Sequence, residues 1–224
     1  DAAAAARARR CSDARGRTFV AAMDQIVAGE FTAAAHAFDA WTHDQQDFAA
    51  VRMAHDLYLH VGDNEGRLRS STQALRHWTV GEPGTSLVAG MHAFSLNEVG
   101  QTDLAERVAR RALDADPRDL WARHALAHVY ETIDDVDAGI GMLDGSREIW
   151  TRQESLAVHI WWHFALRHLA AGRVGAVVDI FDQTLPSADT AFRLSDVTSL
   201  LWRLELAGEH VGTVVLGRPE LPHP

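Results

Sequence analysis

The 224-residue sequence contains a single cysteine, Cys11, so these residues cannot form an internal disulfide or a paired-cysteine zinc or redox motif. A lone cysteine is typical of a reducing compartment, and we expect a cytoplasmic protein. No apolar run reaches the ~18–20 residues that a membrane-spanning helix needs, so we expect no membrane partner. The first ten residues, DAAAAARARR, also lack the apolar centre of a secretory signal peptide, and we expect none in this stretch.

An excess of positive charge is missing as well. The formal net charge is −10 at pH 7 with histidine counted neutral. This acidic balance disfavours binding to nucleic acids and to anionic membranes. Hydrophobic residues make up 47% of the chain and charged residues 23%, which is the composition of a chain that folds around a core.

The common cofactor-binding motifs are also absent from the sequence. It has no GxxxxGK[ST] phosphate loop and no GxSxG nucleophile elbow. Gly139, Gly141 and Gly145 do not form a GxGxxG motif, and small residues that allow close helix packing explain them better. We therefore expect no cofactor on the basis of motifs.

Helical signals dominate what is present. Only Pro83 and Pro117 fall in the first 130 residues, and β-branched residues rarely alternate with polar ones. Apolar residues recur mainly at spacings of three and four, which is the period of a helix with one buried face. The sequence therefore predicts an all-α protein.

The predicted helices form pairs that repeat along the chain. The clearest pair spans Leu87–Pro117, LVAGMHAFSLNEVGQTDLAERVARRALDADP. Gly100 lies at the turn, Ala105 and Ala112 let the two helices approach closely, and Pro117 ends the second helix. This is the form of a tetratricopeptide repeat. Looser copies occupy residues 19–44, 48–78, 120–150 and 156–185, and residues 192–208 supply one more helix.

We therefore expect a tetratricopeptide-like solenoid of helical hairpins, wound as a right-handed superhelix, with about five helix pairs plus a partial sixth. Residues 1–17 form an Ala/Arg-rich N-terminal segment, residues 18–208 the repeat domain, and residues 209–224 an irregular C-terminal tail. The loop Thr79–Ser86, TVGEPGTS, is a candidate boundary between a section of two pairs and a section of three.

Two histidine-rich motifs carry a more specific resemblance. WARHALAHVYE (Trp121–Glu131), GIGMLD and HIWWHFALRHLAAG (His159–Gly172) resemble the signature of the tetratricopeptide repeat protein 38 family, and the likeness covers roughly residues 48–208. Ile160 stands where the family often has Asn, and Thr132 where Met is common. The resemblance implies a helical repeat fold and brings no established reaction, cofactor or partner.

Both motifs place two histidines four residues apart, which puts them on one face of a helix. His124 and His128 form one stripe with Glu131, and His159 and His163 form another. We expect the scaffold to bring the two stripes together in a concave groove. The candidate ligand-binding residues of this groove are Arg52, His55, Asp56, His124, His128, Glu131, His159, Trp162, His163 and Trp202.

Partner recognition is the function that this set favours. A peptide, a protein segment or a small molecule would stack on Trp162 or Trp202 and pair with Arg52 or Asp56. An exposed groove or an uncapped end of the array would also favour self-association. A purely structural alternative stands beside this hypothesis, in which each histidine bonds a neighbour and fixes the angle between helix pairs.

Two enzymatic alternatives use the same histidines, and the sequence does not decide whether the protein is an enzyme. In one, His124, His128, Glu131 and His159 hold zinc or iron(II), and hydrolysis is the natural reaction class. In the other, the histidines act as general acids and bases without a metal.

Overall fold

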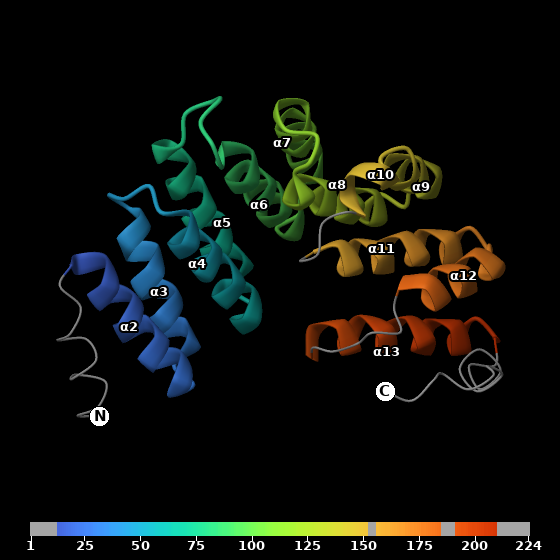
Figure 1. Ribbon diagram of the computed structural model, residues 1–224, viewed down its shortest axis with the longest axis horizontal. Coiled ribbons are helices and arrows are strands. Elements are labelled where there is room, and N and C mark those ends of the chain that lie inside the picture. The colour runs from blue at the N-terminus through green and yellow to red at the C-terminus, as the bar shows by residue number, and fades with distance from the viewer. Residues whose placement is uncertain (1–12, 152–155, 185–190, 210–224) are drawn as a thin grey trace. The chain divides into compact units, whose positions relative to one another are not determined.

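The computed structural model describes residues 13–151, 156–184 and 191–209, and every regular element within these ranges is a helix (Figure 1). This confirms the all-α fold. The α-helices are α2 (Ala14–Val27), α3 (Phe31–Thr42), α4 (Phe48–Val61), α5 (Asn64–Ala74), α6 (Thr85–Glu98), α7 (Thr102–Ala115), α8 (Leu120–Thr132), α9 (Val136–Asp144), α10 (Arg147–Trp150), α11 (Ala157–Ala170), α12 (Val174–Thr184) and α13 (Ala191–Leu206). A short 3-10 helix, η1 (Leu75–His77), follows α5.

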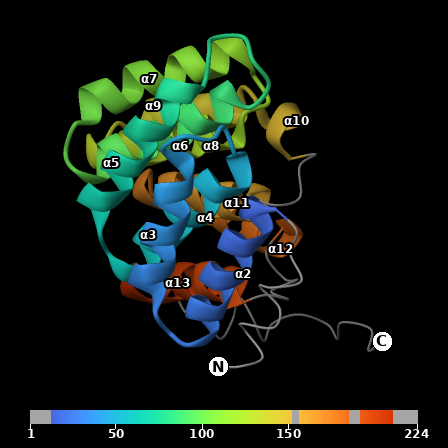
Figure 2. The same cartoon turned by 90° about the vertical axis from the view of Figure 1, so that its left-hand side faces the viewer.

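The chain divides into two compact units, Asp1–Val129 and Tyr130–Pro224. In the first unit, consecutive helices pack as neighbours, from α2 against α3 through to α6 against α7. Figure 2 shows the molecule from the side of α2 and α3, the first of these helix pairs. In the second unit, α11 packs against α9, α12 and α13. The expected hairpin pairs are therefore present in the described residues.

A residue in the left-handed backbone conformation lets the chain reverse between the two helices of a pair. Gly100 has φ +80°, a left-handed conformation that glycine adopts without the steric cost of a β carbon. Asp134 occupies the same place in the α8–α9 pair with φ +55°. Aspartate is one of the few other residues that tolerate this region, because its short side chain bonds locally. The sequence-based placement of both turns is confirmed.

Aspartates also fix where helices begin. Asp47 accepts a hydrogen bond from the amide of Ala50 at 3.3 Å, and Asp135 accepts one from Ala138 at 3.0 Å. An N-cap side chain of this kind satisfies an amide that the first turn leaves without a carbonyl partner. The start of α4 and the start of α9 are thus set by local sequence.

Alanines dominate the core of the first helix pairs. Ala34, Ala35, Ala50 and Ala54 are fully buried around Phe38 in the cluster that joins α2, α3 and α4. Because alanine adds only a methyl group, these helices can approach closely and present a smooth surface to the aromatic ring. Close helix pairing in the first unit follows from this composition.

Trp150 centres the packing of the second unit. Its side chain is fully buried, and Nε1 donates a hydrogen bond to the carbonyl oxygen of Leu143 at 2.8 Å. Its ring meets that of Trp161 edge to face, with centroids 4.6 Å apart. One side chain of the short helix α10 therefore joins the end of α9 to α11.

The candidate boundary at Thr79–Ser86 is wrong. Helices α5 and α6 lie on either side of this loop and pack against each other, so the loop does not interrupt the array. The division falls instead within α8, between Val129 and Tyr130. Residues 1–12 and 210–224 lie outside the described residues, so the domain boundaries at residues 17 and 209 stay predictions, as does the right-handed superhelix.

None of the described helices combines the length and apolar character needed to cross a bilayer.

Candidate ligand-binding surface

A buried carboxylate fixes the start of α8, the helix that carries the first histidine stripe. Asp119 is 1% exposed, and its Oδ1 accepts hydrogen bonds from the amides of Trp121 at 2.8 Å and Ala122 at 3.1 Å. Burial raises the pKa of this carboxyl to about 6, although both amides oppose the rise. The N-terminal turn of α8, and with it the direction in which His124 points, is therefore anchored.

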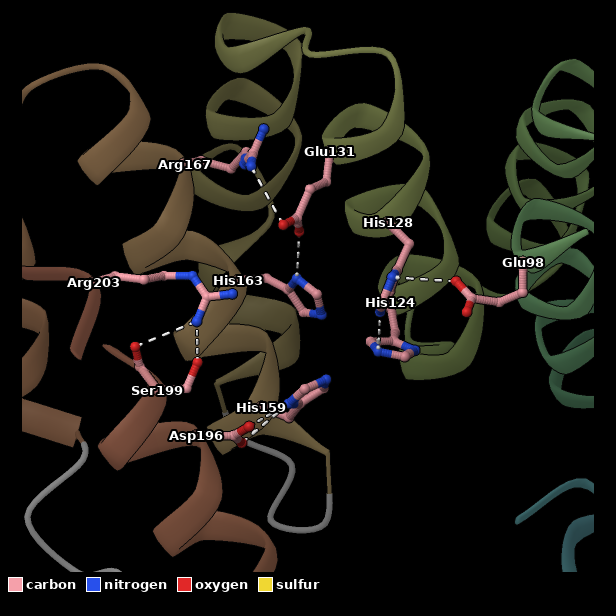
Figure 3. A network of polar contacts seen from close by, with 10 residues as sticks. All are labelled: Glu98, His124, His128, Glu131, His159, His163, Arg167, Asp196, Ser199 and Arg203. Carbon is pink, nitrogen blue, oxygen red and sulfur yellow. Dashed lines mark hydrogen bonds and ion pairs between the residues drawn. The ribbon is translucent and has the colours of Figure 1, made fainter. Parts of the chain in front are cut away.

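His124 and His128 face each other one turn apart on α8. Their Nε2 atoms are 3.0 Å apart, and the two rings meet at 81° (Figure 3). Nδ1 of His128 lies 3.7 Å from Oε1 of Glu98, at the end of α6. The ring of Phe94 contacts both imidazoles, with centroids 4.9 and 4.8 Å away. The helical spacing thus places both imidazoles on one face of α8.

The two charged candidate residues of the first unit lie on α4. Nε of Arg52 is 2.7 Å from Oδ2 of Asp56, and the two side chains are 41% and 40% exposed. The Arg52 guanidinium also lies over the ring of Trp121, 4.5 Å from its centroid. Partial burial raises the pKa of Asp56, and Arg52 opposes the rise. An accessible ion pair therefore packs against the ring of Trp121.

His55 lies beneath this pair and is only 2% exposed. Its ring packs between Phe94 and Trp121, at centroid distances of 5.8 and 5.3 Å. Burial holds its pKa well below the ordinary value, and the nearby charges of Arg67 and Arg52 lower it further. His55 is therefore a neutral packed residue under the surface.

In the second unit, Glu131 of α8 approaches two residues of α11. Its Oε2 lies 3.4 Å from Nδ1 of His163, and its Oε1 lies 3.7 Å from Nη2 of Arg167 (Figure 3). His163 is 1% exposed, whereas the Glu131 side chain is 36% exposed. The carboxylate thus lies between a buried imidazole and the solvent.

His159 is held by α13. Its Nδ1 lies 3.0 Å from both carboxylate oxygens of Asp196, which is 5% exposed. The ring of Trp162 stacks on His159 at an interplanar angle of 13°, with centroids 5.1 Å apart. Trp202, also on α13, is 65% exposed. The second unit therefore offers an oriented histidine and an exposed indole.

Five of the ten candidate residues lie in each unit. Arg52, His55, Asp56, His124 and His128 belong to the first unit. Glu131, His159, Trp162, His163 and Trp202 belong to the second. The expectation that the two histidine stripes share one groove stays a prediction.

Sequence reasoning missed the two carboxylates that contact histidine Nδ1 atoms from other helix pairs, Glu98 and Asp196. Both lie on the first helix of a neighbouring pair, α6 and α13 respectively. An alignment of helix registers between pairs, rather than the spacing inside one helix, is the signal that would have found them.

Comparison with known proteins establishes the fold. The sequence matches no known family model. The crystal structure of a thermophilic TPR protein from Thermus thermophilus is similar with a TM-score of 0.61 and 18% identity, over 84% of this chain and 100% of that one. A tetratricopeptide repeat protein from Parabacteroides merdae is similar with a TM-score of 0.60 and 11% identity, over 95% of this chain and 87% of that one. The chain therefore has the tetratricopeptide repeat fold.

Proposed function

We propose that this chain is a binding and scaffold protein that recognises a peptide or a segment of another protein on the first helices of its repeats. The observation that carries the proposal is the ion pair of Arg52 and Asp56. The two side chains are oriented by each other and by Trp121, yet about 40% of each remains exposed. A pair that is already ordered loses little side-chain entropy when a partner binds it.

The chemistry of the surface defines the partner. Arg52 can pair with a carboxylate of a peptide, and Asp56 can accept hydrogen bonds from its amides or from a basic side chain. In the second unit, the exposed ring of Trp202 offers a flat apolar face. A segment with mixed charge fits the ion pair of the first unit, and an apolar or aromatic side chain fits the indole of the second.

Two finer assignments accompany the proposal. We assign the chain to the tetratricopeptide repeat protein 38 family because both histidine-rich motifs fall on first helices of pairs, α8 and α11. If the assignment is right, homologues that link this chain to that family should contain both histidine pairs. We also place the protein in the cytoplasm, on the basis of its single cysteine.

A peptide library displayed on phage and selected against the wild-type protein tests the function. We expect enriched peptides that bind the purified protein and lose at least about tenfold in affinity, or about 1.4 kcal/mol, when Arg52→Ala and Asp56→Ala are combined. Circular dichroism of the double variant shows whether the helices are retained. Affinity is measured by isothermal titration calorimetry or fluorescence anisotropy.

The matched control is the ion pair of Arg110 and Glu106 on α7. It has the same i, i+4 spacing and a contact of 2.8 Å, but it lies on the second helix of its pair. Combining Arg110→Ala with Glu106→Ala should leave peptide affinity unchanged. The proposal is wrong if no peptide is enriched over an unrelated protein, or if both double variants weaken binding equally.

A further inference from the structure

Three histidines of the two stripes have a carboxylate near Nδ1, and the contact of His159 with Asp196 is a hydrogen bond. The carboxylate is Glu98 for His128 at 3.7 Å, Glu131 for His163 at 3.4 Å and Asp196 for His159 at 3.0 Å. The three carboxylates come from three different helices, α6, α8 and α13 (Figure 3). Helical spacing alone does not produce such a recurrence.

A carboxylate at Nδ1 favours the tautomer that carries its proton on Nδ1, so the lone pair lies on Nε2. It also fixes the rotation of the ring. Histidines that bind metal ions nearly always have such a partner on the nitrogen that does not contact the metal. His159 has this partner, because both oxygens of Asp196 lie 3.0 Å from its Nδ1. The carboxylates near His128 and His163 lie at ion-pair distances of 3.7 and 3.4 Å.

The spacing of nitrogen atoms on α8 fits two ligands of one ion. The Nε2 atoms of His124 and His128 are 3.0 Å apart. Two imidazole nitrogens that are each about 2.0–2.1 Å from a metal lie about 2.9 Å apart at a right angle and about 3.3 Å apart at a tetrahedral angle. In each stripe, the nitrogens available as ligands lie within 4.8 Å of one another. Small side-chain rotations would complete the geometry.

Aromatic rings support both pairs. Phe94 contacts His124 and His128, while Trp162 stacks on His159 and contacts His163 at a centroid distance of 4.8 Å. Such packing limits ring motion before an ion arrives, which reduces the entropy lost on binding. Each stripe is therefore an ordered pair of nitrogen ligands.

We propose that these two histidine pairs, His124 with His128 and His159 with His163, bind divalent transition-metal ions, zinc foremost, through Nε2. Neutral imidazole suits zinc, nickel, copper and iron, and the neighbouring carboxylates offset part of the positive charge that the ion brings. This inference does not rest on the partner-binding proposal, because the metal alone tests it. Water or a partner group supplies any ligand that the histidines do not.

The test uses the full chain purified without a polyhistidine tag. Protein from zinc-supplemented medium is desalted, and its metal content is measured by mass spectrometry. Protein stripped with a chelator is then titrated with Zn²⁺ against a competing indicator, and with Co²⁺, whose visible absorption reports nitrogen ligands. We expect one or two tightly bound ions per chain and a higher melting temperature with zinc. No retained ion, or ions that desalting removes, would overturn the proposal.

Three variants assign the ligands. Combining His124→Gln with His128→Gln, or His159→Gln with His163→Gln, should lower zinc affinity at least tenfold and weaken the Co²⁺ absorption. If a double variant fails to fold, Asp196→Asn keeps every histidine in place and should still weaken zinc binding about 10–100-fold.

The matched control combines His36→Gln with His60→Gln, two exposed histidines of the first unit. This variant should bind zinc as the wild type does. Equal loss of zinc in the control and in the paired variants would show adventitious binding and would overturn the proposal.

Discussion

Gly90 of α6 lies against the backbone of Ala122 in α8. A β carbon at position 90 would lie 2.4 Å from the amide nitrogen of Ala122 and 2.8 Å from the carbonyl carbon of Trp121. Both neighbours are backbone atoms, which cannot rotate away as a side chain can. Only hydrogen fits at this position, so Gly90 sets how closely α8 approaches α6 and hence where His124 meets Phe94.

Gly90→Ala should therefore destabilise the protein, although alanine is the better helix former. We expect a loss of about 1–3 kcal/mol in the free energy of unfolding, because the two helices must separate. Gly141→Ala in α9 is the control, since a β carbon there would meet nothing within 4 Å. It should stabilise by about 1 kcal/mol through helix propensity. Urea denaturation measures both, and a stabilised Gly90→Ala variant would disprove the close contact.

Gly100 and Gly90 show what the sequence could and could not predict. The turn at Gly100 was predictable because it lies between two apolar periods, a local pattern. The role of Gly90 was not, because it depends on a contact with a residue 32 positions later, from Gly90 to Ala122. The histidine stripes follow the same rule. Helical spacing placed His124 beside His128, but the contact of His159 with Asp196 spans separate helix pairs.

Asp47 joins three helices and should be sensitive to substitution. Its Oδ1 caps α4 at Ala50, while its Oδ2 accepts from Nε1 of Trp41 at 3.1 Å and from Nε of Arg15 at 2.5 Å. Burial raises the pKa of Asp47, but the hydrogen bonds from Arg15, Ala50 and Trp41 outweigh it, so the net pKa lies below the ordinary value. The carboxylate therefore stabilises the fold above pH ~4, and this contribution fades as pH falls through its lowered pKa.

We expect Asp47→Ala to lower the free energy of unfolding by about 1–2 kcal/mol at pH 7, the usual cost of losing an N-cap. Asp103→Ala, at an exposed position in the first turn of α7, should cost less than about 0.5 kcal/mol. Denaturation by urea at neutral pH compares them. Equal losses would mean that the contacts of Asp47 with Ala50 and Trp41 add nothing.

His92 of α6 should make stability depend on pH. Burial lowers its pKa to about 4, and its Nδ1 lies 3.0 Å from Oγ of Ser71. An unfolded histidine has a pKa near 6.5, so between pH ~6.5 and ~4 the unfolded chain binds a proton that the folded chain does not. Stability should therefore be complete above pH ~6.5 and fall below it, by up to about 1.4 kcal/mol per pH unit from this residue.

The variant His92→Gln should flatten this slope, because glutamine does not titrate. Ser71→Ala is the control: it removes the hydroxyl beside His92 without removing a titrating group, so it should lower stability by a similar amount at pH 7.5 and at pH 5. Urea denaturation at both pH values gives the comparison. A slope in His92→Gln as steep as that of the wild type would show that His92 is not kept neutral by burial.

We expect Trp150 to stabilise the second unit more than any other side chain that the structure describes there. It is fully buried, donates a hydrogen bond to Leu143 and packs on Trp161. Trp150→Ala should cost about 3–5 kcal/mol, the usual cost of removing a large aromatic side chain from a core. Trp150→Phe keeps most of the apolar area but leaves the Leu143 carbonyl without its indole donor, so we expect a loss of about 1–3 kcal/mol.

Trp202→Ala, at a residue that is 65% exposed, is the control and should cost less than about 0.5 kcal/mol. If the two units unfold separately, only the transition of Tyr130–Pro224 should shift, which hydrogen exchange of the α11 amides can assign. A shift confined to the first unit would contradict the role of Trp150.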